Sequence, residues 1–111
     1  MKPCYAYKLT NTVTGKQYIG ITKKTVAARW TLHVGAALRG KSSHLAEAIR
    51  KYGKDAFLIE CILCCFDYNE LMEYERILID AHNTLKPGGY NLTRGGGGMV
   101  GFKFSDESRK K

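Results

Sequence analysis

The sequence predicts a small α/β (α+β) domain, in which a three-stranded antiparallel sheet is flanked by three helices in the order β-β-α-α-β-α. Three observations predict this fold class. Two short segments rich in strand-forming residues lie on either side of a turn near the N-terminus. Three later segments repeat apolar residues at helical spacing, and a long apolar run separates the second from the third. A chain of 111 residues, 44% of them hydrophobic, has room for one compact domain with a buried core.

The first two predicted strands form a hairpin. The strand at residues 4–10 carries Tyr5 and Tyr7 on one face, because side chains alternate along a strand. Turn-forming residues occupy positions 11–15, and residues 16–21 form the second strand. A loop this short predicts antiparallel pairing of the two strands. The apolar run at residues 56–66 is the third strand, and we expect it to be the most buried of the three.

The first two helices follow the hairpin directly. Thr25 is the expected N-cap of the first helix, which ends near Gly40. Its apolar stripe consists of Val26, Trp30, Val34 and the pair Ala37/Leu38. The serines at positions 42–43 can cap the second helix, and Gly53 stops it. The apolar stripe of this second helix consists of Leu45, Ile49 and Tyr52.

The third helix carries the most informative residue, Glu75. Asp67 or Asn69 can cap this helix, which runs to about His82 along an apolar stripe of Leu71, Tyr74, Leu78 and Ala81. Glu75 is four residues after Leu71, so it lies on the side that faces the core. A carboxylate near a core is costly unless it is paired or bound to a metal. Glu75 is therefore either a metal ligand or acid/base group, or an edge residue that pairs with an arginine.

The end of the chain differs from the rest in composition. Residues 86–89 are typical of a turn, and residues 90–94 are expected to pack on the domain. The glycine run at residues 95–98 is typical of a linker, because no strand–loop–helix context or following Lys-Ser/Thr makes it a phosphate loop. We therefore expect a domain over residues 1–96, followed at 97–111 by a linker and the start of a truncated module.

The composition also bears on the location of the protein. No run approaches the roughly 18 apolar residues of a membrane helix, so no membrane span is expected. The first residues lack an apolar signal region, which predicts a cytoplasmic protein with four reduced cysteines. Three of these, Cys61, Cys64 and Cys65, form a run that lacks the second pair a zinc site needs, so we expect them to be packing residues.

The charge is concentrated in the first half of the chain. The formal net charge is +8, and residues 1–55 hold eleven of the 18 Lys and Arg residues but only two of the ten acids. Such a basic half is typical of a protein that binds a polyanion. DNA or RNA is the first candidate, an anionic membrane surface is the second, and a basic protein that is merely soluble is the alternative.

Arg29 and His33 are candidates for chemistry within this basic half. They are four residues apart on the first helix, so they share one flank beside its apolar stripe. A guanidinium suits phosphate because it stays charged and donates hydrogen bonds in pairs. An imidazole can transfer protons near neutral pH. The alternative is a solvated basic helix face, just as Tyr5, Tyr7 and Tyr18 could be ordinary packing residues of the hairpin.

Taken together, these segments resemble the GIY-YIG nuclease family over about residues 4–96. The first half of the family signature reads Tyr5-Ala6-Tyr7, which keeps only the tyrosine, and the second half, Tyr18-Ile19-Gly20, is intact. Arg29, His33 and His44 follow in order, and then Glu75. The stretch from Asn83 to Gly96 resembles phage and intron homing endonucleases of this family, and the tail at 101–111 resembles the opening of a small DNA-binding module found in them.

The resemblance implies a metal-dependent DNA endonuclease and a role for each residue. Glu75 would hold one divalent cation, Mg²⁺ or alternatively Mn²⁺, and Arg29 would neutralise the scissile phosphate. Tyr7 would be the general base or a proton relay, and Tyr18 and His33 would position the water or tune Tyr7. The expected substrate-binding residues are His44, which would contact the phosphate backbone, Asn91, which would also hold the local geometry, Arg39 and Lys41.

Two other readings remain open at this stage. One is a nucleic-acid-binding module without catalysis, against which the set Tyr7, Tyr18, Arg29, His33 and Glu75 argues, because a binder need not keep Glu75. The other is a repair or restriction nuclease of the same family. The expected partner is DNA, with no small-molecule cofactor, and the protein is expected to act as a monomer or as a weak dimer on DNA.

Overall fold

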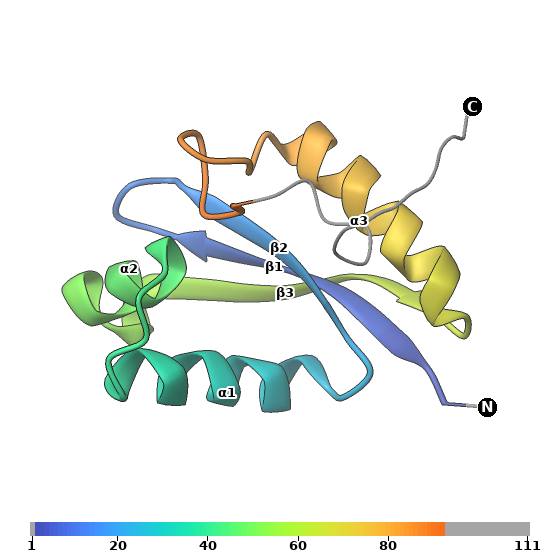
Figure 1. The fold of residues 1–111 in the computed structure, drawn as a ribbon, viewed down its shortest axis with the longest axis horizontal. Helices are drawn as coiled ribbons and strands as arrows, with labels where there is room; N and C mark the ends of the chain where they lie inside the picture. Colours follow the sequence, from blue (N-terminus) through green and yellow to red (C-terminus); the bar gives the residue numbers. More distant parts are fainter. Residues whose placement is uncertain (1, 93–111) are drawn as a thin grey trace.

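The computed structural model describes residues 2–92. It confirms the predicted fold class and order of elements, with one added turn of 3-10 helix between the second helix and the third strand (Figure 1). No helix among the residues described is long and apolar enough to cross a membrane. The elements are β1 (Cys4–Asn11), β2 (Gln17–Thr22), α1 (Val26–Leu38), α2 (His44–Tyr52), η1 (Lys54–Ala56), β3 (Phe57–Cys65) and α3 (Tyr68–His82).

The three strands form an antiparallel sheet in the order β2-β1-β3. Tyr7 of β1 lies opposite Gly20 of β2 and Cys61 of β3, beside a register shift at residues 6–7. The expectation that the third strand is the most buried is wrong. β1 is the central strand and the most buried, whereas β3 lies at an edge and leaves Leu58 51% exposed. An apolar run gives the strand propensity but not the place in the sheet, because strand order depends on pairing between distant segments.

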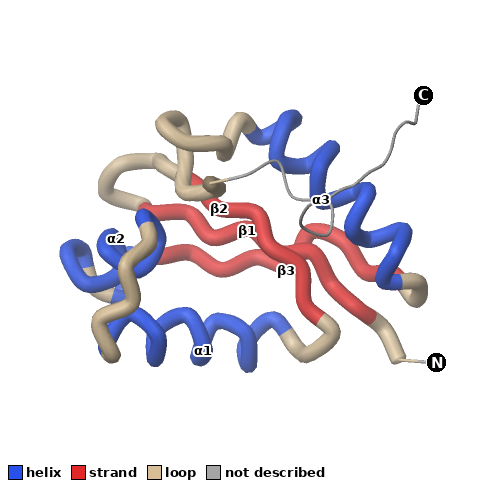
Figure 2. Tube along the Cα trace, viewed as in Figure 1, coloured by secondary structure: helices blue, strands red, loops and turns tan. Residues whose placement is uncertain are grey.

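The helices cover the two faces of the sheet separately (Figures 1 and 2). On one face, Tyr7 and Leu9 of β1 pack in a cluster with residues of α1, α2 and β3. On the other face, Ala6 of β1 packs with Leu71 of α3. Because β1 alternates its side chains between the two clusters, both helix layers are anchored on the same central strand.

Local hydrogen bonds set the helix boundaries close to those predicted. Thr25, Ser43 and Asp67 cap α1, α2 and α3, each accepting hydrogen bonds from backbone N–H groups of the first turn. Asp67 rather than Asn69 is therefore the cap of α3. The stripe predicted for α3 is partly wrong, because Tyr74 is 44% exposed whereas Ile79 is buried.

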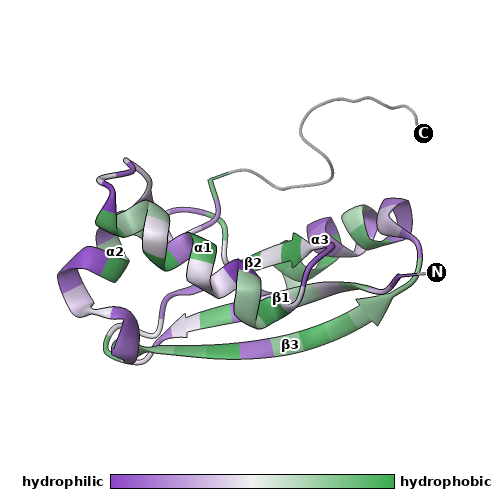
Figure 3. Cartoon of the chain, turned by 90° about the horizontal axis from the view of Figure 1, so that it is seen from below, coloured by the Kyte–Doolittle hydropathy of each residue, from purple (hydrophilic) through white to green (hydrophobic). Residues whose placement is uncertain are grey.

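The cysteine run of β3 does not pack as expected. Cys61 and Cys64 are exposed and Cys65 is half-buried, while the fourth cysteine, Cys4, is buried on β1. Figure 3 shows that β3 is hydrophobic along most of its length even though it is an edge strand. Because β3 pairs with a neighbouring strand on one side only, its side chains can remain exposed to solvent even when they are apolar. This position at the edge explains why Cys61 and Cys64 are exposed although the sequence predicted that they are packed.

The segment after α3 returns to the sheet and binds the outer edge of β2. The backbone N–H of Tyr90 donates to the carbonyl of Gln17 at 2.8 Å, and Leu85 and Asn91 form an isolated parallel bridge. Gly89 approaches this edge so closely that a Cβ would lie 2.5 Å from the carbonyl oxygen of Gln17. The expected packing of this segment on the domain is confirmed up to residue 92, and the linker and tail predicted at 97–111 lie outside the described residues.

Candidate active site

Two tyrosines on the hairpin form the floor of the site. Tyr7 comes from the central strand and is 1% exposed, and Tyr18 comes from β2, with 6.3 Å between the two ring centroids. Gly20 lies between them, because a Cβ at this position would touch the Cζ and hydroxyl of Tyr7 and would lie 2.9 Å from Cε2 of Tyr18. The glycine of the Tyr18-Ile19-Gly20 motif is therefore required by the close approach of the two rings.

Helix α1 places His33 against both tyrosines. Its Nε2 lies 2.7 Å from the Tyr7 hydroxyl, within hydrogen-bond distance. Its ring centroid is 5.9 Å from that of Tyr7 and 5.5 Å from that of Tyr18, the latter in an edge-on arrangement. The predicted flank of α1 that carries Arg29 and His33 therefore faces the hairpin tyrosines.

Arg29 acts on the same two tyrosines. Its guanidinium lowers the pKa of Tyr7 through its charge and a hydrogen bond, and its charge also lowers the pKa of Tyr18. Burial opposes this effect and dominates it, so the pKa of each tyrosine lies above its usual value. Both phenols are therefore protonated at neutral pH.

Glu75 reaches the cluster from α3, on the other side of the sheet. It is half-buried on the helix face that carries Leu71, as predicted. Its negative charge raises the pKa of Tyr7, of Tyr18 and of Tyr68, the first residue of α3. The carboxylate thus lies within electrostatic reach of all three phenols. Five side chains from four elements, namely Tyr7, Tyr18, Arg29, His33 and Glu75, form one cluster.

The environment of His33 sets its protonation state. Burial, and then the positive charges of Arg29 and Lys41, lower the pKa of His33 to about 4. The imidazole is therefore neutral at pH 7, with one ring nitrogen available as an acceptor. A protonated Tyr7 can donate its O–H to Nε2 when Nδ1 carries the ring proton. The hydrogen bond thus joins a phenol that can donate to an imidazole nitrogen that can accept.

Three predicted substrate-binding residues lie on the surface around the loop between α1 and α2. Arg39, Lys41 and His44 are all exposed. The loop is tied down by Arg50, whose guanidinium donates to the carbonyls of Ala37 and Lys41 at 2.8 and 2.9 Å. Lys41 lies close enough to His33 to lower its pKa. For all three residues, contact with substrate stays a prediction.

Asn91 is buried rather than at the surface. Its Oδ1 accepts from the backbone N–H of Ile19 at 2.8 Å and from the hydroxyl of Thr84 at 2.7 Å, and its Nδ2 donates to the carbonyl of Ile19 at 2.9 Å. This side chain therefore extends β2 as an additional strand would, next to Tyr18 and Gly20. These hydrogen bonds are of the kind expected of a residue that holds the local geometry, and contact with substrate stays a prediction.

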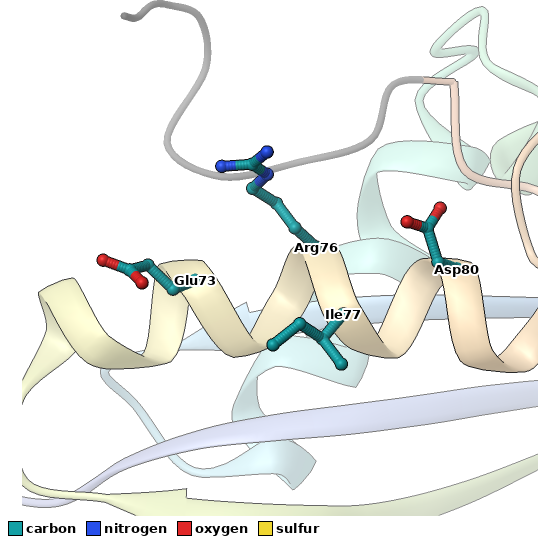
Figure 4. Close-up of a pocket in the computed structure, with 4 residues that line it drawn as sticks. All are labelled: Glu73, Arg76, Ile77 and Asp80. Atoms are coloured by element: carbon teal, nitrogen blue, oxygen red, sulfur yellow. The ribbon is translucent and has the colours of Figure 1, made fainter. Parts of the chain in front are cut away.

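The acidic residues elsewhere on α3 belong to a different surface. Glu73 and Asp80 line an open pocket with Arg76 and Ile77 (Figure 4). These positions are offset by two residues from the Leu71–Glu75 stripe, which puts them on the opposite side of the helix. Within residues 2–92, no group of three or more His, Cys, Asp or Glu side chains could hold a metal ion. Glu75 therefore belongs to no such group within these residues.

Two residues near the site were not singled out in the sequence. Thr84 is fully buried and holds the amide of Asn91, but nothing local marks it. Tyr68 lies near Glu75 and Arg29, whose charges shift its pKa in opposite directions. The signal for Tyr68 was available, because it precedes Glu75 by seven residues and therefore shares its helix face.

Two named phage proteins are similar to this chain in sequence. Endonuclease segA of Enterobacteria phage T4 is 30% identical over 109 residues, which cover 96% of this chain and 46% of the relative. Putative endonuclease segD of the same phage is 28% identical over 92 residues, covering 83% of this chain and 38% of the relative. The chain thus spans less than half of the length of these phage proteins.

Two solved structures and the sequence model of a domain family match most of this chain. The catalytic domain of homing endonuclease I-TevI is 26% identical, with a TM-score of 0.70 over 81% of this chain and 98% of that chain. A mutant of the catalytic domain of intron endonuclease I-TevI is 25% identical, with a TM-score of 0.73 over 83% of this chain and 95% of that chain. The family description of the GIY-YIG catalytic domain matches residues 3–91. The chain therefore belongs to the GIY-YIG catalytic domain family.

Proposed function

We propose that this chain is the catalytic domain of a divalent-metal-dependent DNA endonuclease of the homing type, which hydrolyses phosphodiester bonds. One observation carries the proposal: an arginine, a glutamate, a neutral histidine and two phenols converge from both sides of one sheet. The similarity to endonuclease segA of phage T4 and to the catalytic domain of homing endonuclease I-TevI supports it. The basic first half of the chain supports DNA as the partner.

Arg29 is the group suited to the scissile phosphate. Its charge and a hydrogen bond act on Tyr7. The guanidinium is therefore close enough to contact a phosphate that is bound beside the Tyr7 hydroxyl. A guanidinium stays charged and can donate two parallel hydrogen bonds to phosphate oxygens. It would stabilise the extra negative charge that develops on the phosphorus-bound oxygens in the transition state.

Glu75 is the residue that would hold the metal ion, Mg²⁺ or alternatively Mn²⁺. Mg²⁺ is commonly bound through one or two carboxylates, with waters and substrate phosphates as the other ligands. A single half-buried carboxylate beside Arg29 and the phenols fits that pattern better than it fits zinc, which needs a fuller set of protein ligands. When bound, the ion would supply Lewis-acid stabilisation of the departing oxygen.

Tyr7 and His33 form the route for the proton of the attacking water. Tyr7 is protonated, so it is not a preformed base, and the simplest role left is a relay. The water would pass its proton to the Tyr7 oxygen while Tyr7 passes its own proton to Nε2 of His33, 2.7 Å away. The negative charge of a bound phosphodiester would raise the pKa of His33 and help it accept the proton.

Plasmid cleavage tests this function. Supercoiled DNA is incubated at low salt with Mg²⁺ or with EDTA, using the parent chain, Glu75→Gln and the control Glu73→Gln. Glu73 is exposed on the opposite side of the same helix, so its variant controls for the loss of one acidic charge. We expect nicked or linear product from the parent and from Glu73→Gln, only with Mg²⁺, and a loss of at least a hundredfold in Glu75→Gln.

Two outcomes would contradict the proposal. Cleavage that survives EDTA would remove the metal requirement. A DNA band shift by the parent without any product, under all metal conditions and in a longer chain as well, would favour a nucleic-acid-binding module without catalysis.

A further inference from the structure

Lys23 makes a contact that the proposed chemistry does not use. It lies in the loop between β2 and α1, and its Nζ is 4.6 Å from the centroid of the Tyr68 ring at the start of α3. This distance is within the range of about 6 Å for a cation–π interaction. The two residues are far apart in the sequence, since Lys23 precedes α1 and Tyr68 begins α3. The position of the Lys23 ammonium is therefore set by a tertiary contact.

The Lys23–Tyr68 pair lies beside the active site, on the Glu75 side. Tyr68 and Glu75 are seven residues apart on α3, so they share one helix face and are separated by about 10 Å along its axis. The charges of Glu75 and Arg29 both act on the Tyr68 phenol. Lys23 in turn precedes Arg29 by six residues, just before the N-cap of α1. The ammonium therefore lies near the cluster without being part of it.

Lys23 is also available to an anion. Lys23 is exposed, and the salt bridge within residues 2–92 joins Lys8 to Glu60 and does not involve Lys23. An ammonium over a ring face keeps its remaining N–H groups directed away from the ring. A phosphate oxygen is the anion that the proposed substrate presents at regular spacing.

We propose that Lys23, held on the ring of Tyr68, binds a backbone phosphate of the DNA a few nucleotides from the scissile bond, on the Glu75 side. This inference rests on the proposed function and assigns a substrate-binding residue to that site. A phosphate contact of this kind would set the register of the strand across Glu75 and Arg29 without reading its sequence.

The adjacent lysine provides a matched control. Lys24 is also exposed and has the same charge, but within residues 2–92 it lacks the ring contact, and its backbone N–H donates to the Thr22 hydroxyl at 3.0 Å. If only the overall charge of the loop matters, Lys23→Ala and Lys24→Ala will be equivalent. If the ring builds a site, they will differ.

DNA binding measured as a function of salt tests the inference. Fluorescence anisotropy of a labelled duplex is recorded in EDTA, so that no cleavage occurs, with the 111-residue parent and each variant. Log K falls as log salt rises, and we expect Lys23→Ala to reduce the magnitude of this slope by about one, uniformly across DNA sequences. Lys24→Ala should reduce it by clearly less. Equal changes in the two variants, or no change in Lys23→Ala, would overturn the inference.

Tyr68 variants separate the ring contact from a structural effect. Tyr68→Phe keeps the ring face and should retain the parent slope, whereas Tyr68→Leu should reduce its magnitude. In the double variant, Lys23→Ala should then add little to the effect of Tyr68→Leu. In cleavage assays, Lys23→Ala should raise KM with kcat nearly unchanged. Full additivity of the two substitutions would contradict the pairing.

The two proposals fail in distinguishable ways. If the parent does not cleave with Mg²⁺, the endonuclease proposal fails, and the salt slopes still decide whether Lys23 binds phosphate. If the parent cleaves and the two lysine variants behave alike, only the assignment of Lys23 fails.

Discussion

The hydrogen bond between Tyr7 and His33 joins two groups whose pKa values are displaced in opposite directions. Burial raises the pKa of the phenol and lowers that of the imidazole, so both are neutral over a wide range around pH 7. The sequence predicted both residues as part of the site but offered Tyr7 as either base or relay. Desolvation favours the relay, because it stabilises the protonated phenol.

Acid should destabilise the fold through His33. Its pKa is about 4 in the folded chain against 6.5 when unperturbed. As the pH falls below 6.5, the unfolded chain binds a proton at this residue while the folded chain does not until about pH 4. The free energy of unfolding therefore decreases across that window, and the loss is complete below it.

Urea denaturation at pH 7.5 and pH 4 measures this effect. The acid-induced loss should be smaller in His33→Asn than in the parent by on the order of 2 kcal/mol, which is about 1.4 kcal/mol per pKa unit reduced for solvent access. His44→Asn, at an exposed histidine, should lose as much as the parent. An identical acid-induced loss in His33→Asn and the parent would refute the burial of a neutral imidazole here.

At the scale of elements, the pairing of β1 with β2 depends on one glycine. Gly20→Ala should destabilise the fold by about 1–3 kcal/mol and abolish cleavage, because the new methyl group overlaps the Tyr7 ring, which is 1% exposed and cannot move aside. Thermal unfolding and plasmid nicking together measure both losses.

Gly35→Ala in α1 is the contrasting substitution. Its Cβ would meet only the end of the flexible Arg39 side chain, at 3.1 Å. Alanine within a helix is favoured over glycine, so this variant should gain about 0.5–1 kcal/mol. If Gly20→Ala behaved like Gly35→Ala, the close packing of the two tyrosines against β2 would be wrong.

At the scale of the whole molecule, Asn91 closes the fold by joining the last described segment to β2. Asn91→Ala would leave the backbone N–H and C=O of Ile19 without these partners, and Ile19 is fully buried. Each such group costs about 1–3 kcal/mol, so the two together predict a loss of about 2–6 kcal/mol in chemical denaturation. An unchanged unfolding midpoint combined with weaker DNA binding would instead assign Asn91 to substrate contact.

Local signals in the sequence determined the order of the elements and their ends. Apolar periodicity and caps such as Thr25 and Asp67 act over three or four residues, so they can be recognised without knowing the rest of the fold. The same periodicity placed Glu75 on the inner face of its helix. The family resemblance carried by the signature residues predicted the five side chains that the structure brings together.

Only the tertiary structure decided the place of each strand, the surroundings of each side chain and the contacts between distant segments. β1 rather than β3 became the central strand, Cys61 and Cys64 became exposed, and Lys23 met Tyr68. The neutral state of His33 likewise depends on burial and on charges brought from two parts of the chain. Strand pairing, burial and the local electrostatic potential each depend on residues that are far apart in the sequence. A pattern of neighbouring residues therefore does not determine them.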